Sequence, residues 1–360
     1  MKMSILCVLE RKCAVDAKAG VLQSRSQTAL RTISVAVFPG SLLPSPTSAS
    51  TAPETSMIVI ARNFGQLGNR LLLSANLIAA AREHGVQLLN PSFAGYAQYF
   101  ESTANDLWCR FPVAESANQA SGPPSPALRT TLYKAVYLSG RTLSHLRMTK
   151  FPFHIIRITD EQRYDLRSPE FIRKAQGRRP VLVSGWKFDA GKLLHKHADT
   201  VRQFYRIRTE HQQRIDELMR RVRAQGNHVV GVHIRQGDYA KFQNGRYFYS
   251  IDQYVAAMKR IRNQFSDRQV VFLVCGNVPL GDKDFGDLNV CLGTGQIIED
   301  MYSLAACDTL VGPPSTYTGW ASFYGRVPFR WMESVDEAFN VIDPPYLVGA
   351  DNAQPMACAA

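Results

Sequence analysis

The sequence of 360 residues lacks a long hydrophobic run and lacks paired cysteines. Its longest apolar segment, residues 71–81, contains Ser74 and Asn76 and falls well short of the roughly 20 residues that cross a bilayer as a helix. The seven cysteines are scattered, and none forms a Cys-x-x-Cys pair or a His/Cys cluster at metal-ligand spacing. These absences predict no transmembrane helix, no structural zinc site and a reduced compartment, the cytoplasm.

Several catalytic motifs are missing as well. The chain has no Gly-x-Ser-x-Gly elbow, no Gly-x-x-x-x-Gly-Lys-Ser/Thr loop and no His-Glu-x-x-His helix. We expect no metal-binding aspartate pair, which argues against a metal-dependent nucleotide-sugar enzyme. His195 and His197 would point apart on a helix, so we expect both at the surface. The prediction is an enzyme without a bound metal ion or cofactor.

The chain does have an excess of positive charge, 42 Lys and Arg against 30 Asp and Glu, for a net charge of +12. Such a field attracts nucleic acid, an anionic membrane surface or a phosphorylated substrate. The basic residues are spread along the chain without a long Lys/Arg run, so we expect no nucleic-acid partner. Peripheral association with a membrane through the basic surface stays open, and the oligomeric state is not predicted.

Residues 1–56 differ in composition from the rest of the chain. They end in a segment rich in Pro, Ser, Thr and Ala that cannot bury a core, which predicts a disordered extension. A secretory signal peptide is a poor match, because charged residues at 10–12 directly follow a short apolar run. Met57 opens the run Met-Ile-Val-Ile, typical of a first strand, so Met57 is a candidate start of the protein.

Strand and helix patterns alternate from Met57 onward. The first half is expected to contain a strand at 57–62, a Gly-containing turn at 63–69, a long helix ended by Gly85, a strand from Val86, a loop at 101–127, a helix at 128–147, an irregular stretch to about 170 and a strand at 181–184. The second half is expected to contain helices at 209–225, 251–265, 299–306 and 316–325 and strands at 228–234, 269–275 and 309–312.

Such alternation is typical of parallel sheets. We therefore predict an α/β, GT-B-like fold with two Rossmann-like lobes behind the disordered extension. The N-terminal lobe, 57–208, would form the acceptor side, and the C-terminal lobe, 209–345, would bind a nucleotide sugar, followed by a tail at 346–360. The amphipathic helix at 209–225 would bridge the lobes.

A Gly-containing turn joins the first strand to the first helix at 63–70, Asn-Phe-Gly-Gln-Leu-Gly-Asn-Arg. Gly65 and Gly68 permit a tight turn that presents backbone N–H groups at a helix N-terminus, which favours an anion or a polar sugar. A turn with Asn69 as the helix cap explains the same residues equally well. The spacing is not Gly-x-Gly-x-x-Gly, so a dinucleotide site is weakly indicated.

The run at 229–239, Val-Val-Gly-Val-His-Ile-Arg-Gln-Gly-Asp-Tyr, is a short buried strand that stops abruptly. His233 and Arg235 fall on the same side of the strand, and Gly237 lets the chain turn before Asp238. Ligands of a parallel sheet bind beyond the carboxyl ends of its strands, where Arg235 could hold a diphosphate. The alternative is an Arg235–Asp238 structural ion pair beside a buried, satisfied His233.

A third block runs from Glu299-Asp300-Met301 through Cys307-Asp308 to Pro-Pro-Ser315-Thr316. Ser315 and Thr316 would start a helix, where hydroxyls and free N–H groups together suit a phosphate. Helix capping accounts for only one of these hydroxyls.

Three segments in this order resemble the α-1,2-fucosyltransferases, a glycosyltransferase family 11-like group within the His-x-Arg-x-Gly-Asp fucosyltransferase superfamily. Residues 65–70 are similar to the Gly-x-Leu-Gly-Asn opening, 233–239 to the His-x-Arg-x-Gly-Asp-Tyr motif, and 300–325 to the Asp-Met-Tyr, Cys-Asp, Ser/Thr and Trp block. A fourth, weaker similarity covers 184–207. The resemblance spans about 57–330 and implies a metal-independent, GDP-fucose-dependent enzyme of glycan biosynthesis.

The resemblance also implies roles for single residues. Arg235 would bind the β-phosphate, His233 and Asp300 would contact guanine, and Ser315 and Thr316 would hold phosphate. Gly68 and Asn69 would complete the donor site, and Asp238 is the nearest candidate by sequence for the base that removes the acceptor proton. The implied reaction is an inverting transfer of L-fucose to a glycan hydroxyl, a galactoside 2-hydroxyl in that family.

The chain departs from the family pattern at three places. Many relatives have a second Arg where this chain has Gln236, and an acid is missing from the Cys275-Gly276-Asn277 segment. The usual Asn-Ser-Ser/Thr turn is replaced by the Pro-Pro-Ser-Thr sequence at 313–316. Two alternatives therefore remain, a glycosyltransferase that uses another nucleotide sugar and a nucleotide-sugar-binding relative without turnover.

Overall fold

The computed structural model describes residues 56–113, 122–145, 152–332 and 340–342. Every described residue belongs to a single compact unit. The predicted disordered extension, apart from Ser56, and the predicted tail at 346–360 lie outside the described residues. No helix in the described part of the chain is long and apolar enough to cross a membrane.

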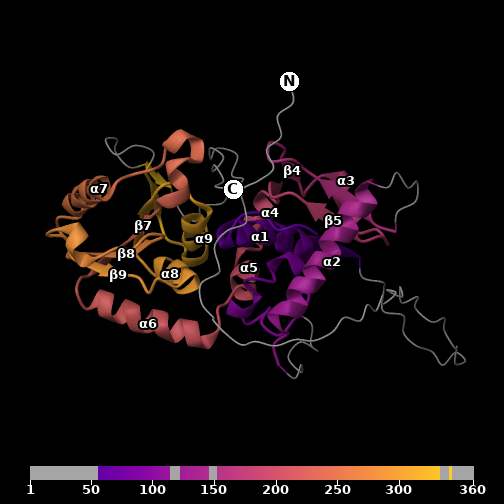
Figure 1. Ribbon diagram of the computed structural model, residues 1–360, viewed down its shortest axis with the longest axis horizontal. Helices are drawn as coiled ribbons and strands as arrows, with labels where there is room; N and C mark the ends of the chain where they lie inside the picture. The colour runs from indigo at the N-terminus through magenta and orange to yellow at the C-terminus, as the bar shows by residue number, and fades with distance from the viewer. Residues whose placement is uncertain (1–55, 114–121, 146–151, 333–339, 343–360) are drawn as a thin grey trace, which may run out of the picture. The chain divides into compact units, whose positions relative to one another are not determined.

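The first lobe, drawn in indigo to magenta in Figure 1, is built on a parallel sheet of four strands in the order β2-β1-β5-β3. Its strands are β1 (Met57–Ile60), β2 (Gln87–Leu89), β3 (His154–Arg157) and β5 (Val181–Ser184). Its helices are α1 (Leu67–His84), α2 (Pro126–His145), α3 (Pro169–Ala175), α4 (Lys192–Lys196) and α5 (Ala198–Phe204), with short 3-10 helices η1 (Pro91–Phe93) and η2 (Ala97–Tyr99). A small parallel pair, β4 (Tyr164–Asp165) and β6 (Phe188–Asp189), lies beside this sheet.

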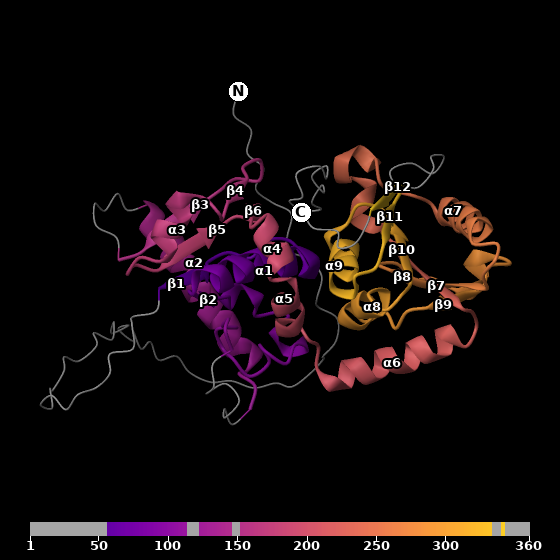
Figure 2. The same ribbon diagram turned by 180° about the vertical axis from the view of Figure 1, so that it is seen from behind.

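The second lobe has a sheet of six strands in the order β12-β11-β10-β7-β8-β9 (Figure 2). Its strands are β7 (His228–Ile234), β8 (Val270–Gly276), β9 (Val290–Leu292), β10 (Thr309–Gly312), β11 (Phe329–Trp331) and β12 (Asn340–Ile342). Its helices are α6 (Thr209–Arg223), α7 (Ile251–Gln264), α8 (Ile297–Leu304) and α9 (Thr316–Gly325), with η4 (Gly237–Ala240), η5 (Phe242–Gly245) and η6 (Asp282–Phe285). All neighbours are parallel except β11 and β12.

β7 lies in the middle of its sheet, between β10 and β8, and each of its residues is buried. Such a strand reads as a continuous apolar run because helices cover both faces of a parallel sheet. The strand is closely packed at Gly231, where a Cβ would lie 2.7 Å from the Leu310 side chain. The buried strand thus fixes the point at which Arg235 leaves the sheet.

α1 is buried along almost its whole length, from Leu67 to Ala81, with Arg70 as the exception. It packs against α4 and α5 of its own lobe and against α9 of the second lobe. The helix ends at Gly85, which adopts the left-handed conformation and donates its N–H to the Ala81 carbonyl. The predicted end of this helix is therefore confirmed.

The two lobes are joined by direct contacts near α9. The Tyr302 hydroxyl donates to the Tyr205 carbonyl at 2.7 Å. Arg202 donates from Nε and Nη2 to the Phe323 carbonyl at 3.0 and 2.8 Å. The Tyr205 and Trp320 rings meet edge to face at 5.4 Å, and both side chains are fully buried. Aromatic packing and hydrogen bonds thus hold the lobes against each other.

The predicted α/β architecture with two parallel-sheet lobes is confirmed. The expectation of an irregular stretch to about 170 was wrong, because β3 pairs with β5 in register there. β3 is an edge strand with one buried residue, so it lacks the apolar run of a central strand. The lobe boundaries at 208 and 345 stay predictions, although each sheet falls within one of the predicted ranges.

Candidate functional site

The N-termini of α1 and α9, one helix from each lobe, meet at Gly68. A Cβ at Gly68 would lie 2.7 Å from the Thr316 carbonyl carbon and 2.7 Å from the Tyr317 nitrogen. Only glycine therefore allows this approach of the two backbones. The first N–H groups of a helix have no partner within the helix, and the helix dipole is positive at this end. Two electropositive ends are thus brought to one place.

Arg235 comes directly after β7 and points into the same place. Its side chain is 14% exposed, and its Nη2 donates to the Asp238 carboxylate at 2.7 Å. The guanidinium carbon lies 5.3 Å from the centre of the Tyr239 ring. Within the described residues, the buried Nε of Arg235 has no hydrogen-bond partner. An oriented cation with an unused donor is a recognisable feature of an anion site.

One cavity collects these features from both lobes. It is lined by Gln66, Leu67, Gly68, Asn69, Arg235, Tyr239, Ile297, Ser315, Thr316 and Tyr317. An adjoining cavity of about 200 Å³ shares Gln66, Arg235, Ile297 and Tyr317 with it. The second cavity is further lined by His233, Cys275, Gly276, Asn277, Gly295 and Asp300. The predicted site residues other than Asp238 therefore line two connected cavities.

His233 is buried at the end of β7 and is held by two neighbours from α9. Its Nδ1 lies 2.7 Å from the Thr318 hydroxyl, and its ring lies 4.9 Å from the Tyr317 ring. Burial, with a smaller effect of the nearby Arg235 charge, lowers the pKa of His233 to about 3. The imidazole is therefore neutral near pH 7, so it can hydrogen-bond a ligand without adding charge.

Asp300 is buried on α8, 5% exposed, and lines the second cavity. Its Oδ1 accepts from the Thr294 N–H at 2.7 Å and from the Gly295 N–H at 3.2 Å. Burial raises the pKa of this carboxyl above its usual value, against the opposing effect of these hydrogen bonds. The backbone contacts fix one oxygen of the carboxylate at the cavity wall.

Ser315 caps α9, and its hydroxyl accepts from the Tyr317 N–H at 3.2 Å. The capping role that competed with phosphate binding is thus present for this hydroxyl. Asn69 packs into the turn at Gly65, where a Cβ would lie 2.0 Å from its side-chain nitrogen, and Gly65 has a φ of +54°. The expectation of Asn69 as the helix cap was wrong, because α1 already begins at Leu67 after Gln66 and has no side-chain cap. Asn69 lies in the first turn of the helix and lines the cavity with Thr316.

Asp238 lies in η4 with its side chain 41% exposed. Its ion pair with Arg235 is the structural contact that we weighed against a role as base. Asp238 does not line either of the two cavities. The geometry makes Asp238 a partner that orients the guanidinium, and its role as base stays a prediction.

Gln236, one of the departures from the family pattern that the sequence resembles, does not line either cavity. Its Nε2 donates to the Tyr249 carbonyl at 2.9 Å. The Asn277 side chain binds the Gln236 backbone twice, accepting from its N–H at 2.8 Å and donating to its carbonyl at 3.0 Å. The residue at 236 is therefore part of the frame that fixes the loop after β7.

A further group that the motif analysis missed lies on the first-lobe side. Asp189, at the end of β6, lines a small cavity with Asn69, Trp186 and Thr316. Its carboxylate accepts from the Gly191 N–H at 2.8 Å, and its side chain is 12% exposed. The weak match over 184–207 pointed to this segment, but strand ends this short carry no distinct residue pattern.

The expected absence of an aspartate pair was wrong, because Asp282 and Asp284 have the Asp-x-Asp spacing. Both are exposed on η6, and Asp284 accepts from the Gly281 N–H at 2.8 Å. No group of three or more His, Cys, Asp or Glu in the described ranges could hold a metal ion. His195 is exposed as expected, whereas the His197 side chain is only 14% exposed and lies 2.6 Å from the Glu83 carboxylate.

No protein-family model matches the chain, and no curated protein sequence matches it. Among solved structures, the chain is similar to an arginine-to-lysine mutant of Arabidopsis thaliana FUT1 in complex with GDP, at 13% identity and a TM-score of 0.49, over 77% of this chain and 70% of that one. It is similar to the fucosyltransferase NodZ from Bradyrhizobium at 16% identity and a TM-score of 0.47, over 81% and 99%. POFUT1 in complex with GDP-fucose is 10% identical with a TM-score of 0.43, over 77% and 95%. These similarities concern the fold, and no activity follows from them.

Proposed function

We propose that the protein transfers L-fucose, with inversion, from GDP-fucose to a hydroxyl of a glycan acceptor. The observation that carries the proposal is the position of Arg235 in a cavity lined by the N-terminal ends of α1 and α9. A diphosphate in that cavity would meet one guanidinium and two sets of helix N–H groups. For the acceptor, the sequence resemblance favours a galactoside 2-hydroxyl.

The same groups would act on the departing diphosphate. As the bond between the sugar and the β-phosphate breaks, negative charge grows on the leaving oxygen. Donors that are already oriented stabilise such charge without reorganising, and this is the most effective form of electrostatic catalysis. The Arg235–Asp238 ion pair supplies that orientation, since it fixes the guanidinium before a ligand arrives.

The guanine base would occupy the adjoining cavity of about 200 Å³. Guanine presents two adjacent N–H donors, and a carboxylate is an acceptor that matches them. Asp300 has one oxygen held by backbone N–H groups, so its orientation at the cavity wall is fixed. Neutral His233 would provide a further hydrogen-bonding group. This pairing of Asp300 with guanine supports GDP over nucleotides that lack those donors.

Two carboxylates could take the proton of the acceptor hydroxyl. Both are paired with an arginine, Asp238 with Arg235 at 2.7 Å and Asp189 with Arg163 at 3.4 Å, but Asp238 does not line the cavities. Asp189 lines a cavity that shares Asn69 and Thr316 with the diphosphate cavity. We infer that Asp189 is the better-placed base. In matched variants, Asp189→Asn should remove the rise of kcat with pH that a titrating base produces, whereas Asp238→Asn should lower kcat and keep that rise; the reverse result would restore Asp238 to the role of base.

The nucleotide assignment can be tested by thermal unfolding with GDP, UDP, ADP and CMP. GDP should raise the unfolding midpoint most, because a ligand that binds only the folded state stabilises it. Preference for UDP would exclude fucose as the donor and would leave a glycosyltransferase with another nucleotide sugar. The activity itself is tested by mass spectrometry of a glycan panel incubated with GDP-fucose. Tight GDP binding without sugar release on any acceptor would indicate a binding protein.

A further inference from the structure

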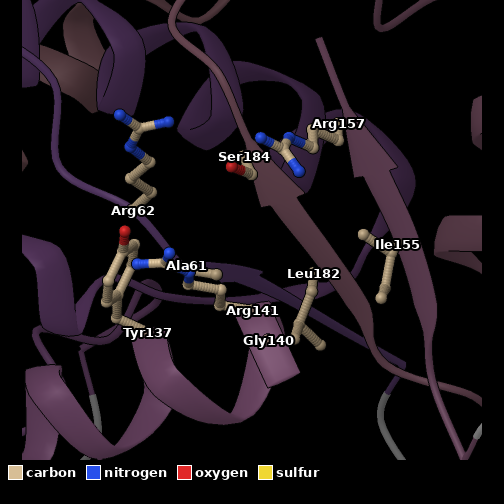
Figure 3. A pocket seen from close by; sticks show the side chains of 9 residues that line it. All are labelled: Ala61, Arg62, Tyr137, Gly140, Arg141, Ile155, Arg157, Leu182 and Ser184. Atoms are coloured by element: carbon tan, nitrogen blue, oxygen red, sulfur yellow. The ribbon is translucent and has the colours of Figure 1, made fainter. Parts of the chain in front are cut away.

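A cavity of about 450 Å³ lies in the first lobe, at the carboxyl ends of β1, β5 and β3 (Figure 3). Its lining residues are Ala61, Arg62, Tyr137, Gly140, Arg141, Ile155, Arg157, Leu182 and Ser184. Ligands of open parallel sheets bind at this edge, beyond the ends of the strands. The cavity has the volume of a small-molecule site, and none of its residues belongs to the diphosphate cavity.

The wall opposite the strands is one face of α2. The Tyr133 hydroxyl donates to the Asn63 side chain at 2.7 Å and accepts from the Asn63 N–H at 3.3 Å, which ties α2 to the loop after β1. Tyr137, Gly140 and Arg141 follow at helical spacing and line the cavity. A Cβ at Gly140 would be 3.6 Å from the Leu182 side chain, so the helix lies directly over the sheet edge.

Three arginines line this cavity, and no Asp or Glu does. They come from the loop after β1, from α2 and from the end of β3, and Figure 3 shows Arg62, Arg141 and Arg157 around the same space. Arg62 lies over the Phe64 ring at 4.7 Å. Within the described ranges, Arg62 and Arg157 take part in no ion pair with a carboxylate. Like charges repel when they share a concave wall, and a bound anion would offset that repulsion.

The loop that lines this cavity also reaches the diphosphate cavity. Ala61 and Arg62 line the first, and Gln66 begins the part of the loop that lines the second. Four residues of extended chain span about 14 Å at most, so the two cavities lie within that reach along the loop. We call the cavity lined by Arg62, Arg141 and Arg157 the arginine cavity. A saccharide bound there could reach the donor sugar with one of its hydroxyls.

We propose that the acceptor is an acidic saccharide, whose carboxylate, sulfate or phosphate group binds to Arg62, Arg141 and Arg157. This inference rests on the proposed glycosyl transfer and specifies the class of its acceptor. The arginine fork forms paired hydrogen bonds with each of these anions, whereas a neutral sugar offers no charge to the three guanidinium groups. Tyr137 and Ser184 add hydroxyls that can bind the sugar ring.

Binding is measured first without turnover. A trigalacturonic acid probe and its carboxyl-reduced neutral counterpart are titrated into the full chain by calorimetry, together with sulfated and phosphorylated forms of the neutral trisaccharide. At least one acidic form should bind about tenfold more tightly than the neutral one, and the tightest identifies the anion. Arg62→Gln and Arg157→Gln should each weaken it about tenfold, whereas Arg220→Gln on α6 removes the same charge and should leave it unchanged.

The inference is overturned if the neutral trisaccharide binds as tightly as every acidic form, or if Arg220→Gln weakens binding as much as the cavity variants do. Inorganic sulfate or phosphate binding as tightly as the saccharides would show a simple anion site. Arginine-dependent binding to anionic lipid vesicles with none to the saccharides would assign the cavity to a membrane surface. GDP affinity is measured on the same variants. If the wild-type protein does not bind GDP, the proposed transferase is contradicted, whereas the saccharide titrations test the acidic-saccharide site by themselves.

Discussion

The cavities of the two lobes hold their arginines in different ways. In the second lobe, Arg235 is mostly buried and paired with Asp238, three residues away in the same loop. In the first lobe, Arg62, Arg141 and Arg157 come from three separate segments, and all three are exposed. A cation that stabilises a transition state works best when its position is fixed in advance. A cation that only recognises a ligand can stay solvated until the ligand binds.

This contrast extends to the helices that meet at the site. α9 of the second lobe begins with the Ser315 side-chain cap, whereas α1 of the first lobe begins after Gln66 without a side-chain cap. The two N-termini touch at Gly68. The diphosphate cavity is built by both lobes, whereas the arginine cavity belongs to the first lobe alone. Changes in the two places should thus affect different kinetic constants.

The largest effect is expected from Arg235→Gln. Loss of an oriented donor from a developing negative charge lowers kcat by roughly 100- to 1,000-fold. The fold should persist, because Arg235 is a loop residue outside the hydrophobic core. Steady-state kinetics with GDP-fucose and thermal unfolding measure the two effects separately.

Arg220→Gln is the matched control for charge, since Arg220 is exposed on α6 and lines neither the diphosphate cavity nor the cavity with the three arginines. It should keep the wild-type kcat. A fall of several degrees in the unfolding midpoint of Arg235→Gln, with kcat restored at low temperature, would show that the Arg235–Asp238 pair is structural. The contrast between fixed and solvated arginines would then lose its catalytic meaning.

Gly68→Ala tests the contact between the lobes. Its Cβ would lie 2.7 Å from backbone atoms of Thr316 and Tyr317, which cannot move as a flexible side chain can. Overpacking of this kind costs about 1–3 kcal/mol of unfolding free energy. We expect GDP affinity to fall about tenfold, because the two helix N-termini separate. Denaturant unfolding and calorimetric titration with GDP measure these changes.

Gly95→Ala is the matched control, because a Cβ at Gly95 would have no atom within 4 Å. It should leave both stability and GDP affinity unchanged. If Gly68→Ala binds GDP as tightly as wild type, the diphosphate does not depend on the approach of α1 to α9, and the site belongs to the second lobe alone.

Asp300→Asn gives a smaller, pH-dependent effect. Burial raises the pKa of Asp300 in the folded protein above its unfolded value, so folding is coupled to proton uptake. The stability that this carboxyl contributes is present below about pH 4 and is lost as the pH rises through the folded pKa. Asn keeps an acceptor for Thr294 and Gly295 and cannot ionise. Its unfolding free energy should therefore improve relative to wild type between about pH 4 and pH 7.

The same variant should bind GDP more weakly than wild type at pH 7, because an amide cannot accept two guanine N–H donors as a carboxylate does. Protection by ADP should change little. Thermal unfolding at several pH values, with and without each nucleotide, provides both comparisons. If Asp300→Asn loses as much affinity for ADP as for GDP, the guanine ring does not bind beside Asp300.

The smallest effect is expected from Gln236→Arg, although it adds a second cation next to Arg235 in the sequence. The side chain at 236 extends toward the Tyr249 carbonyl, away from the diphosphate cavity. We expect kcat/KM to change by less than about threefold, the scale of an exposed charge. A gain of tenfold or more would show that a second cation at this position reaches the leaving group.

Parts of both lobes could be predicted from sequence because their signals are local. The buried run of β7, the Gly85 cap of α1 and the hydroxyl at the start of α9 can each be recognised from a few consecutive residues. β3 and β9 could not be found, since neither has a fully buried run of apolar residues. Their pairing with β5 and β8 supplies the order that their own sequences lack.

The site followed the same division. His233 and Arg235 could be placed at the end of β7, because strand periodicity puts them on one side. The lowered pKa of His233 could not, because it depends on burial in the folded protein. The direction of Gln236 could not be foreseen, since it depends on Tyr249 and Asn277. Nor could Asp189 be recognised, because its cavity exists only where α1 and α9 pack beside β6.

The sequence by itself determined the alternation of strands and helices, the caps at Gly85 and Ser315 and the motif that carries Arg235, because backbone preferences and burial patterns act over a few residues. Only the tertiary structure decided that Gly68 would meet Thr316, and that Arg62, Arg141 and Arg157 would share one cavity. These residues lie far apart along the chain and carry no common local pattern. Their meeting follows from the packing of whole helices and sheets.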